Sequence, residues 1–278
     1  ICFPNAKINL GLHVISRRPD GYHNLETIFY PLDLRDALEI IPGSSSGSNE
    51  HRFFQTGNAI EGTPDENLVM KALRLISAKK KIPPIDIHLL KKIPTGAGLG
   101  GGSSDAAFML RLLNDTFSLG YTHKQLRGLA AQLGADCPFF IDNTPSYATG
   151  IGDKLKPVEI NLDPYFLLLV KPDIAVSTKE AYGMITPRKP ELSLKKIIKM
   201  PVTDWRGWMI NDLEIPIFRK YPEIWLIKEQ MVHLGAIYAS MSGSGSAVFG
   251  IFEKEPSWQT LFSRHFVWAS NGKQADSK

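Results

Sequence analysis

The chain is poor in cysteine and has no long apolar run. Two cysteines among 278 residues, Cys2 and Cys137, cannot build a disulfide framework. No stretch approaches the ~20 apolar residues of a membrane span. Lysine and asparagine interrupt the first apolar residues by position 9, which is unlike a signal peptide. These absences favour a protein of the reducing cytoplasm that has no membrane partner.

Neither positive nor negative charge is in large excess. The 32 basic and 28 acidic residues leave a formal charge of +4, and the basic residues are spread along the chain. This balance favours phosphate-bearing small molecules over nucleic acid as partners. With 43% hydrophobic residues, the chain is long enough to bury a sizeable core, and we expect two domains.

The first strand is indicated by strict alternation from Ala6 to Val14. Its apolar residues lie on one face, while Lys7, Asn9 and His13 lie on the other, so a half-buried strand is predicted. A turn follows in RRPDGYHN, and strand-like sequence then continues to Ile41.

Further elements follow from hydrophobic spacing and turn residues. We predict helices at 67–80, 104–114 and 122–133, strands at 85–89 and 165–170, a strand–turn–strand at 238–252, and a loop at 43–50. Gly134 is expected to close the third helix. Strands and helices do not alternate regularly, which favours an α+β fold over a doubly wound parallel sheet.

One stretch, IPTGAGLGGGSSDAA at 93–107, has five glycines in the seven positions from Gly96 to Gly102. It lies between a strand and a helix, where bare backbone N–H groups and the helix dipole can hold an anion. Ser103 and Ser104 add hydroxyl donors and a helix cap. A flexible surface loop is the alternative, which the ordered flanks disfavour. We therefore predict a phosphate-binding loop.

Other phosphate loops do not fit this stretch. A dinucleotide fold needs a second strand with an acidic residue about 20 positions on, where this chain is predicted to be helical. A Walker A loop needs a lysine after its last glycine, and none occurs between Lys92 and Lys124. The H-R-D and D-F-G signatures of protein kinases are missing.

The glycine stretch resembles the phosphate loop of the GHMP kinases, the galactokinase, homoserine, mevalonate and phosphomevalonate kinase family. Its enlarged G-L-G-G-G-S-S form is similar to one branch, whose acceptor is a cytidine diphosphate ester of methylerythritol. Agreement extends to four further stretches: PNAKINLGLHV (4–14), RRPDGYHNLETIF (17–29), LGADCPFF (133–140) and MSGSGSAVF (241–249). Between 187 and 235 only NDLE (211–214) resembles the sequences of this branch, so no function is assigned there.

The resemblance implies a two-lobed α+β fold with the active site in the cleft between the lobes. It implies an N-terminal domain at 1–155, related to a ribosomal-protein fold and carrying the ATP loop, and a C-terminal domain at 156–278 that completes the substrate site. The implied reaction is ATP-dependent phosphorylation of the ester's 2-hydroxyl, on the non-mevalonate route to isoprenoid precursors. A homoserine or mevalonate kinase, or a non-catalytic nucleotide or RNA binder, is the alternative.

Two residues are predicted to be catalytic by the same resemblance: Asp136 as general base and Lys7 beside it. A neighbouring ammonium favours the carboxylate and a developing alkoxide, so the pair makes chemical sense. The alternatives are a loop-capping aspartate and a solvated edge lysine. Pro138 is expected to end any helical continuation after Asp136. Cys137 is interpreted as a packing residue, because no histidine nearby supports thiol chemistry.

The acceptor is expected to meet aromatic and polar side chains. Tyr22 and His23 offer a flat partner and edge hydrogen bonds for cytosine, while packing is the alternative for both. The other expected substrate residues are Asn9, Thr178, Tyr182, Ser242 and Gly243. Of these, Tyr182 is expected either to stack on cytosine or to pack at helical spacing. The SGSGS segment is expected to be a mobile flap, with a tight hairpin as the alternative.

ATP and Mg²⁺ are the expected cofactors. The residues assigned to ATP are Pro94, Thr95, Gly96, Ala97, Gly98, Leu99, Gly100, Gly101, Gly102, Ser103, Ser104 and Asn67. For Asn67, contact with adenine and helix capping are both open. No metal ligand is assigned, and we expect a monomer or weak homodimer.

Overall fold

The structure is a computed structural model that describes residues 1–43, 50–60 and 62–270. It divides into two compact units that interleave along the chain. Unit 1 comprises Ile1–Lys7, Pro31–Thr95 and Gly100–Thr144, and unit 2 comprises Ile8–Tyr30, Gly96–Leu99 and Pro145–Lys278. The loop predicted at 43–50 lies mostly outside the described residues. The division into domains at residue 155 stays a prediction.

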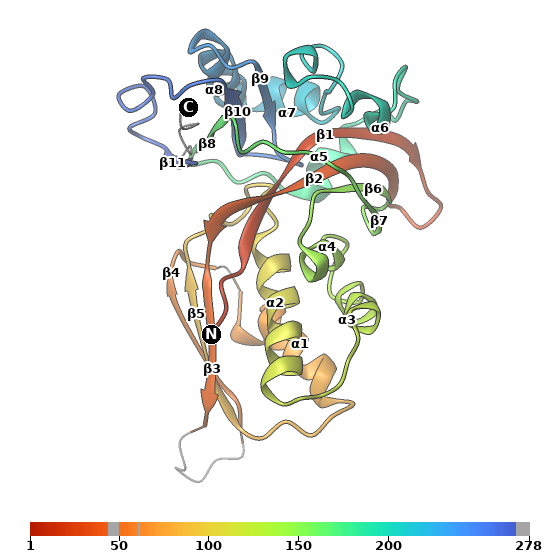
Figure 1. Cartoon of the computed structure of the whole chain (residues 1–278), viewed down its shortest axis with the longest axis vertical. Coiled ribbons are helices and arrows are strands. Elements are labelled where there is room, and N and C mark those ends of the chain that lie inside the picture. The colour runs from red at the N-terminus through yellow and green to blue at the C-terminus, as the bar shows by residue number, and fades with distance from the viewer. Residues whose placement is uncertain (44–49, 61, 271–278) are drawn as a thin grey trace, which may run out of the picture. The chain divides into compact units, whose positions relative to one another are not determined.

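Unit 1 is a three-stranded sheet with helices on one side (Figure 1). The sheet has the order β3-β5-β4, with β3 antiparallel and β4 parallel to the central strand. Its strands are β3 (Ala37–Pro42), β4 (Arg52–Gly57) and β5 (Ile85–Lys91), and its helices are α1 (Leu68–Ser77), α2 (Gly101–Thr116), α3 (His123–Ala130) and α4 (Cys137–Asp142), with a 3₁₀ turn at Pro64–Glu66. The strand predicted at 85–89 is confirmed.

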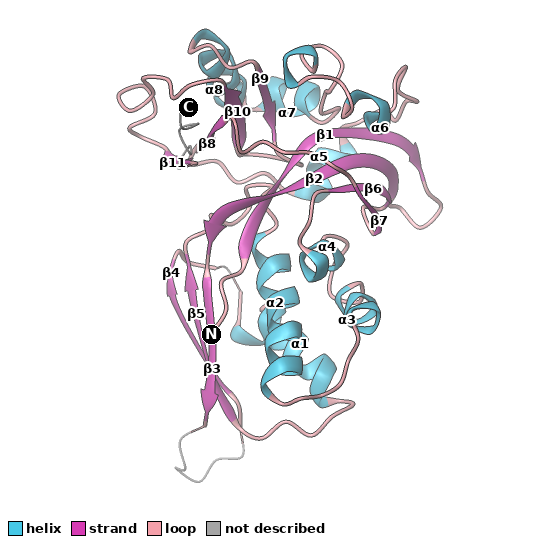
Figure 2. Ribbon diagram, in the orientation of Figure 1, coloured by secondary structure: helices cyan, strands magenta, loops and turns pink. Residues whose placement is uncertain are grey.

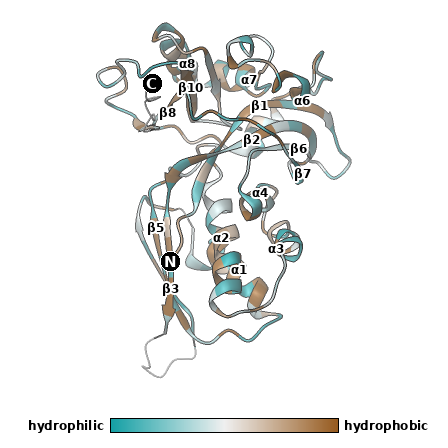
Figure 3. Ribbon diagram, viewed as in Figure 1, coloured by the Kyte–Doolittle hydropathy of each residue, from teal (hydrophilic) through white to brown (hydrophobic). Residues whose placement is uncertain are grey.

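The helix predicted at 67–80 is confirmed as α1, with Asn67 as its cap. The Asn67 Oδ1 accepts a hydrogen bond from Val69 N at 2.9 Å, so the capping role is observed. Figure 3 shows hydrophilic and hydrophobic segments alternating along α1 and α2, as expected for helices with one buried face. Contact between Asn67 and adenine stays a prediction.

The start of α2 differs from the predicted Ser104. The helix begins at Gly101, its cap is Gly100 in a left-handed conformation (φ 69°), and no side chain caps it. The prediction that Ser103 and Ser104 cap the helix is therefore wrong. Glycine reaches the left-handed region without a Cβ penalty, which lets the turn end three residues earlier. Two of the five glycines thus lie in the first helical turn.

The end of α3 and the role of Pro138 also differ from expectation. The helix ends at Ala130, and Gly134 does not take the left-handed conformation of a closing glycine. Residues 131–136 continue in turns, and Asp136 precedes the short helix α4. Pro138 therefore helps to begin a helix instead of ending one, because proline is tolerated in a first turn whose N–H groups have no helical partner.

A second sheet has the order β1-β2-β6-β7 (Figure 2). Its strands are β1 (Asn5–Arg17), β2 (His23–Arg35), β6 (Ser146–Gly150) and β7 (Lys154–Pro157). The strand predicted at 6–14 is confirmed, but the prediction that it is half-buried is wrong: every residue from 5 to 14 is buried. The part of β1 in unit 2 is fully buried because other segments of that unit cover its polar face. A Cβ on Gly11 would lie 2.8 Å from Leu194 and 2.9 Å from Met209.

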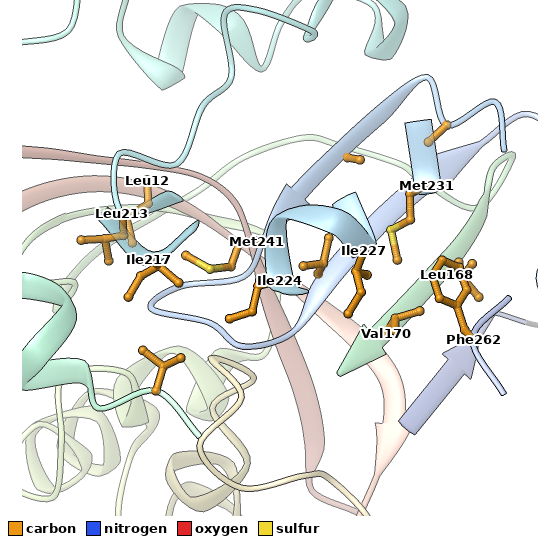
Figure 4. Close-up of a cluster of buried hydrophobic side chains, with 14 of the residues drawn as sticks. Leu12, Leu168, Val170, Leu213, Ile217, Ile224, Ile227, Met231, Met241 and Phe262 are labelled. Atoms are coloured by element: carbon orange, nitrogen blue, oxygen red, sulfur yellow. The ribbon is translucent and has the colours of Figure 1, made fainter. Parts of the chain in front are cut away.

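Unit 2 also holds an antiparallel sheet of order β11-β8-β10-β9. Its strands are β8 (Phe166–Lys171), β9 (Tyr238–Met241), β10 (Val248–Phe252) and β11 (Phe266–Ala269), accompanied by α5 (Thr178–Gly183), α6 (Leu194–Ile197), α7 (Glu214–Lys220) and α8 (Pro222–His233), with a 3₁₀ turn at Val202–Asp204. The strands predicted at 165–170 and 238–252 are confirmed. Side chains from β1, α7, α8 and this sheet form one hydrophobic cluster (Figure 4).

Candidate active site

Lys7 and Asp136 form an ion pair within unit 1. The Lys7 Nζ lies 3.3 Å from Asp136 Oδ2, and the side chains are 4% and 33% exposed. Lys7 comes from the start of β1, and Asp136 from the turn before α4. Lys7 is therefore not a solvated edge lysine, whereas its carboxylate partner remains accessible to solvent.

The start of α2 lies against Lys7. A Cβ on Gly100 would lie 3.1 Å from Lys7 Cε and 3.0 Å from the ring of Phe140. Position 100 therefore favours glycine for two independent reasons: the backbone is left-handed, and neighbouring side chains lie too close for a Cβ. The first-turn N–H groups of α2, which no side chain caps, begin at this point of the chain. An ammonium, a carboxylate and a helix N-terminus therefore meet in unit 1.

The middle of the glycine stretch, Gly96–Leu99, belongs to unit 2. Its glycines are left-handed, with φ of 61° at Gly96 and 74° at Gly98, while Ala97 and Leu99 are buried. The two apolar side chains anchor the segment, and the glycine before each of them turns the backbone. A Cβ on Gly98 would lie 2.0 Å from Ser242 O, so no other residue fits there without displacing the backbone.

The SGSGS segment connects β9 to β10 and is buried from Ser242 to Ser246. Ser242 N donates to Ala247 O at 2.8 Å, Gly245 N donates to Ser242 O at 2.9 Å, and Ala247 N donates to Ala97 O at 3.2 Å. These are the contacts of a tight hairpin, the second of the two alternatives. They are not those of a mobile flap, because its backbone groups are bonded to each other and to the glycine stretch.

The Ser242 hydroxyl links two predicted site segments inside unit 2. It donates to Gly98 O at 2.9 Å and accepts from Asn9 N at 3.2 Å. Because its one hydrogen points at Gly98 and the side chain is buried, Ser242 serves here as a link between backbones. A contact of Ser242 or Gly243 with substrate stays a prediction.

Asn9 is buried on the polar face of β1. Its Nδ2 donates to Thr27 Oγ1 at 2.8 Å, and Thr27 in turn donates to Gly11 O at 2.6 Å. Thr27 therefore orients the Asn9 amide. Sequence reasoning missed it, although its polar character in a buried strand was a signal.

The aromatic residues expected near cytosine lie in unit 2. Tyr22 is 61% exposed, whereas His23 stacks on Tyr182 with ring centroids 5.4 Å apart. Burial, and then the charge of Arg17, lower the pKa of His23, which favours a neutral ring that can donate and accept. Tyr182 thus stacks on His23 here, and Thr178 Oγ1 lies 3.2 Å from Ser244 Oγ.

Thiol chemistry and a protein-built metal site find no support. Burial raises the pKa of the Cys137 thiol to about 12, so the residue is a packing group as predicted. In the part of the chain that the structure describes, no group of three histidine, cysteine, aspartate or glutamate side chains could hold a metal ion.

The unassigned region 187–235 contains a residue that sequence reasoning missed. Asn211, in NDLE, is buried and donates from Nδ2 to Met241 O and Gly243 O, both at 2.8 Å. Its signal was the motif itself. By contrast, Trp205 of DWRGW is a core residue whose Nε1 donates to Met200 O at 3.1 Å.

Two family models match the chain. The model described as GHMP kinases N terminal domain matches residues 67–144, and the model described as GHMP kinases C terminal matches residues 203–260. A curated relative from Parabacteroides distasonis is 56% identical over 270 residues, which is 96% of this chain and 98% of that protein. The chain belongs to the GHMP kinase family. The α+β fold and the use of ATP follow from this membership.

Two curated relatives and one solved structure carry the same enzyme name. The Parabacteroides protein and one from Bacteroides thetaiotaomicron, 53% identical over 92% of this chain and 93% of that protein, are both named 4-diphosphocytidyl-2-C-methyl-D-erythritol kinase. A crystal structure of 4-(cytidine 5'-diphospho)-2C-methyl-D-erythritol kinase is 35% identical over 96% of this chain and 97% of that one, with a TM-score of 0.80.

The fold is also shared at lower identity. The Methanococcus jannaschii mevalonate kinase is 13% identical over 96% of each chain, with a TM-score of 0.70. Among the described residues, none of the helices has the length and hydrophobicity that crossing a membrane requires.

Proposed function

We propose that this GHMP kinase transfers the γ-phosphoryl group of ATP to the 2-hydroxyl of 4-diphosphocytidyl-2-C-methyl-D-erythritol. The observation that carries the proposal is the Lys7–Asp136 pair beside Gly100 at the start of α2. It brings a proton acceptor and a buried positive charge to the end of a phosphate-binding loop. The names of relatives at 53–56% identity support the choice of acceptor.

Each member of this group has a distinct chemical task. Asp136, with its carboxylate partly exposed, accepts the proton of the attacking hydroxyl. Lys7 offsets the negative charge that develops on the oxygen and on the transferred phosphoryl group. The N–H groups of the glycine stretch and of the first turn of α2 bind the phosphates.

The acceptor would be held by residues of unit 2. Asn9 lies two positions from Lys7 on β1, and its amide, oriented by Thr27, is suited to a polyol hydroxyl. Tyr22 offers an exposed ring to cytosine, and the neutral His23 ring offers hydrogen bonds to the base edge. Tyr182 supports His23 by stacking, and Thr178 begins the same helix, α5, with its hydroxyl 3.2 Å from Ser244 Oγ.

ATP is expected to enter as its magnesium complex. Such an ion would supply charge compensation for the phosphates. We assign it no protein ligand. We also propose that the enzyme acts in the cytoplasm and needs no nucleic acid. We propose that it is a monomer or a weak homodimer, and size-exclusion chromatography of the active enzyme would test this oligomeric state.

One assay discriminates the acceptor. The purified protein is offered Mg²⁺ and ATP with the cytidyl erythritol ester, mevalonate or homoserine in parallel, and phosphate transfer is followed by mass spectrometry. We expect phosphorylation of the ester alone. Transfer to mevalonate or homoserine would reassign the acceptor, and transfer to none of the three would refute the proposed acceptor.

A further inference from the structure

Asn211 fixes a segment of unit 2 to the strand that carries Asn9. Its backbone forms a parallel bridge with Leu12 of β1: Leu12 N donates to Ile210 O at 3.0 Å, and Asp212 N donates to Leu12 O at 2.8 Å. Its side chain is buried with the residue 2% exposed. The segment before α7 therefore cannot move without moving β1.

The Asn211 side chain makes three hydrogen bonds. Nδ2 donates to Met241 O and to Gly243 O, both at 2.8 Å, and Oδ1 accepts from Leu213 N at 3.0 Å. A neutral amide has two donors and an acceptor in one plane, which meets all three partners without burying a charge. The first half of the SGSGS hairpin is thereby held from both sides of Ser242.

The hairpin is in turn bonded to both predicted substrate segments. Ser242 Oγ donates to Gly98 O at 2.9 Å in the glycine stretch and accepts from Asn9 N at 3.2 Å in β1. Ala247 N adds a bond to Ala97 O at 3.2 Å. The position of Ser242 thus fixes the distance between the backbones of Gly98 and Asn9.

We propose that Asn211 is a positioning residue of the kinase reaction. By holding the carbonyl groups of Met241 and Gly243, it places the Ser242 hydroxyl and, through it, one residue of the ATP loop and one residue of the acceptor site. This inference rests on the proposed function. It assigns a positioning role in catalysis to the NDLE motif, through the bonds of Asn211 to Met241 O and Gly243 O.

The deciding experiment is steady-state kinetics of Asn211→Asp with both substrates varied. The aspartate keeps an acceptor for Leu213 N but replaces the two donors with oxygen facing two carbonyl oxygens. We expect KM to rise about tenfold or more for ATP and for the acceptor, since lost hydrogen bonds of this kind cost about that much. KM values unchanged for either substrate would overturn the proposal.

The matched control is Ser270→Ala, which also removes a side-chain hydrogen bond inside unit 2. It removes the acceptor of the bond from Leu167 N to Ser270 Oγ (2.9 Å), whose two partners belong neither to the SGSGS hairpin nor to the segment around Asn211. We expect loss of thermal stability with both KM values within about twofold of the wild type. If Ser270→Ala raised both KM values as Asn211→Asp does, the effect would be general loosening of the fold, and the proposal would be wrong.

A double-mutant cycle tests whether Asn211 acts through Ser242. If it does, Asn211→Asp in a Ser242→Ala background adds little to the KM change of Ser242→Ala alone. Independent, multiplicative effects would overturn the route. Should Asn211→Asp fail to fold, Ser242→Ala decides alone: it must raise both KM values, and unchanged values refute the link. Absence of phosphate transfer by the wild type would instead refute the proposed function.

Discussion

Lys7 Nζ lies 3.3 Å from Asp136 Oδ2, although 129 positions separate the two residues in sequence (136 − 7). The lysine is almost fully buried and the aspartate is partly exposed. This asymmetry suits a pair in which one member meets the substrate hydroxyl and the other supplies fixed charge.

Asp136→Asn keeps the shape of the side chain but removes its ability to accept a proton. We expect kcat to fall by about 10² or more with a small change in KM for ATP. Rapid-quench measurement of phosphate transfer checks the chemical step directly. An unchanged kcat would remove Asp136 from its proposed role.

Tyr22→Ala removes an exposed ring from the turn between β1 and β2. If that ring stacks on cytosine, binding of the cytidyl substrate should weaken by roughly 1–3 kcal/mol. KM for ATP should stay unchanged. Trp225→Ala is the control, because Trp225 on α8 is similarly exposed, at 48%, and has no proposed contact with substrate. Weakened ATP binding without weakened acceptor binding would misplace the cytidine site.

The elements with strong periodicity were predictable from the sequence. The alternation in β1 and the helical spacing in α1 report local burial, which a short stretch of sequence encodes. The errors lie where distant segments decide the outcome. Burial of Lys7 and Asn9 depends on segments more than a hundred positions away, and the half-buried pattern of β1 does not carry that information.

The predictions from local residue types were also wrong at the starts of two helices, α2 and α4. Ser103 and Ser104 look like caps, but Gly100 takes that place because its left-handed backbone turns the chain earlier. Pro138 looks like a terminator, but proline suits a first helical turn equally well. Asn211 carried only a weak signal, since the partners of its Nδ2, Met241 O and Gly243 O, become its neighbours through tertiary folding alone.

Gly98→Ala tests the close approach of the glycine stretch to the hairpin. The added Cβ would lie 2.0 Å from Ser242 O at a φ of 74°, so the loop must move. We expect ATP binding, measured by isothermal titration calorimetry, to fall at least about tenfold, as for 1.4 kcal/mol or more of strain. Gly128→Ala in α3 is the control. Nothing lies within 4 Å of its Cβ, so activity should persist while stability rises by up to ~1 kcal/mol. Normal ATP binding by Gly98→Ala would contradict the loop geometry.

We expect Asp105 to make the stability of the protein depend on pH. Its carboxylate is buried in α2, with Oδ2 2.8 Å from Lys91 Nζ, and Lys91 also pairs with Asp36. Burial raises the pKa of Asp105 from 3.8 to about 7, against the opposing effect of Lys91. The unfolded chain therefore releases this proton at lower pH than the folded chain. Its contribution is complete below about pH 4 and is lost as the pH rises through about 7.

Asp105→Asn cannot titrate, so it removes this dependence. The free energy of unfolding of the wild type relative to the variant should fall by about 3 kcal/mol between pH 5 and pH 8. Urea unfolding at both pH values measures this difference, and the comparison cancels the fixed cost of burying an amide in place of a carboxyl group. Equal pH dependence in the two proteins would show that Asp105 has the same pKa folded and unfolded. A difference of opposite sign would mean that Lys91 outweighs burial and holds the carboxylate ionised.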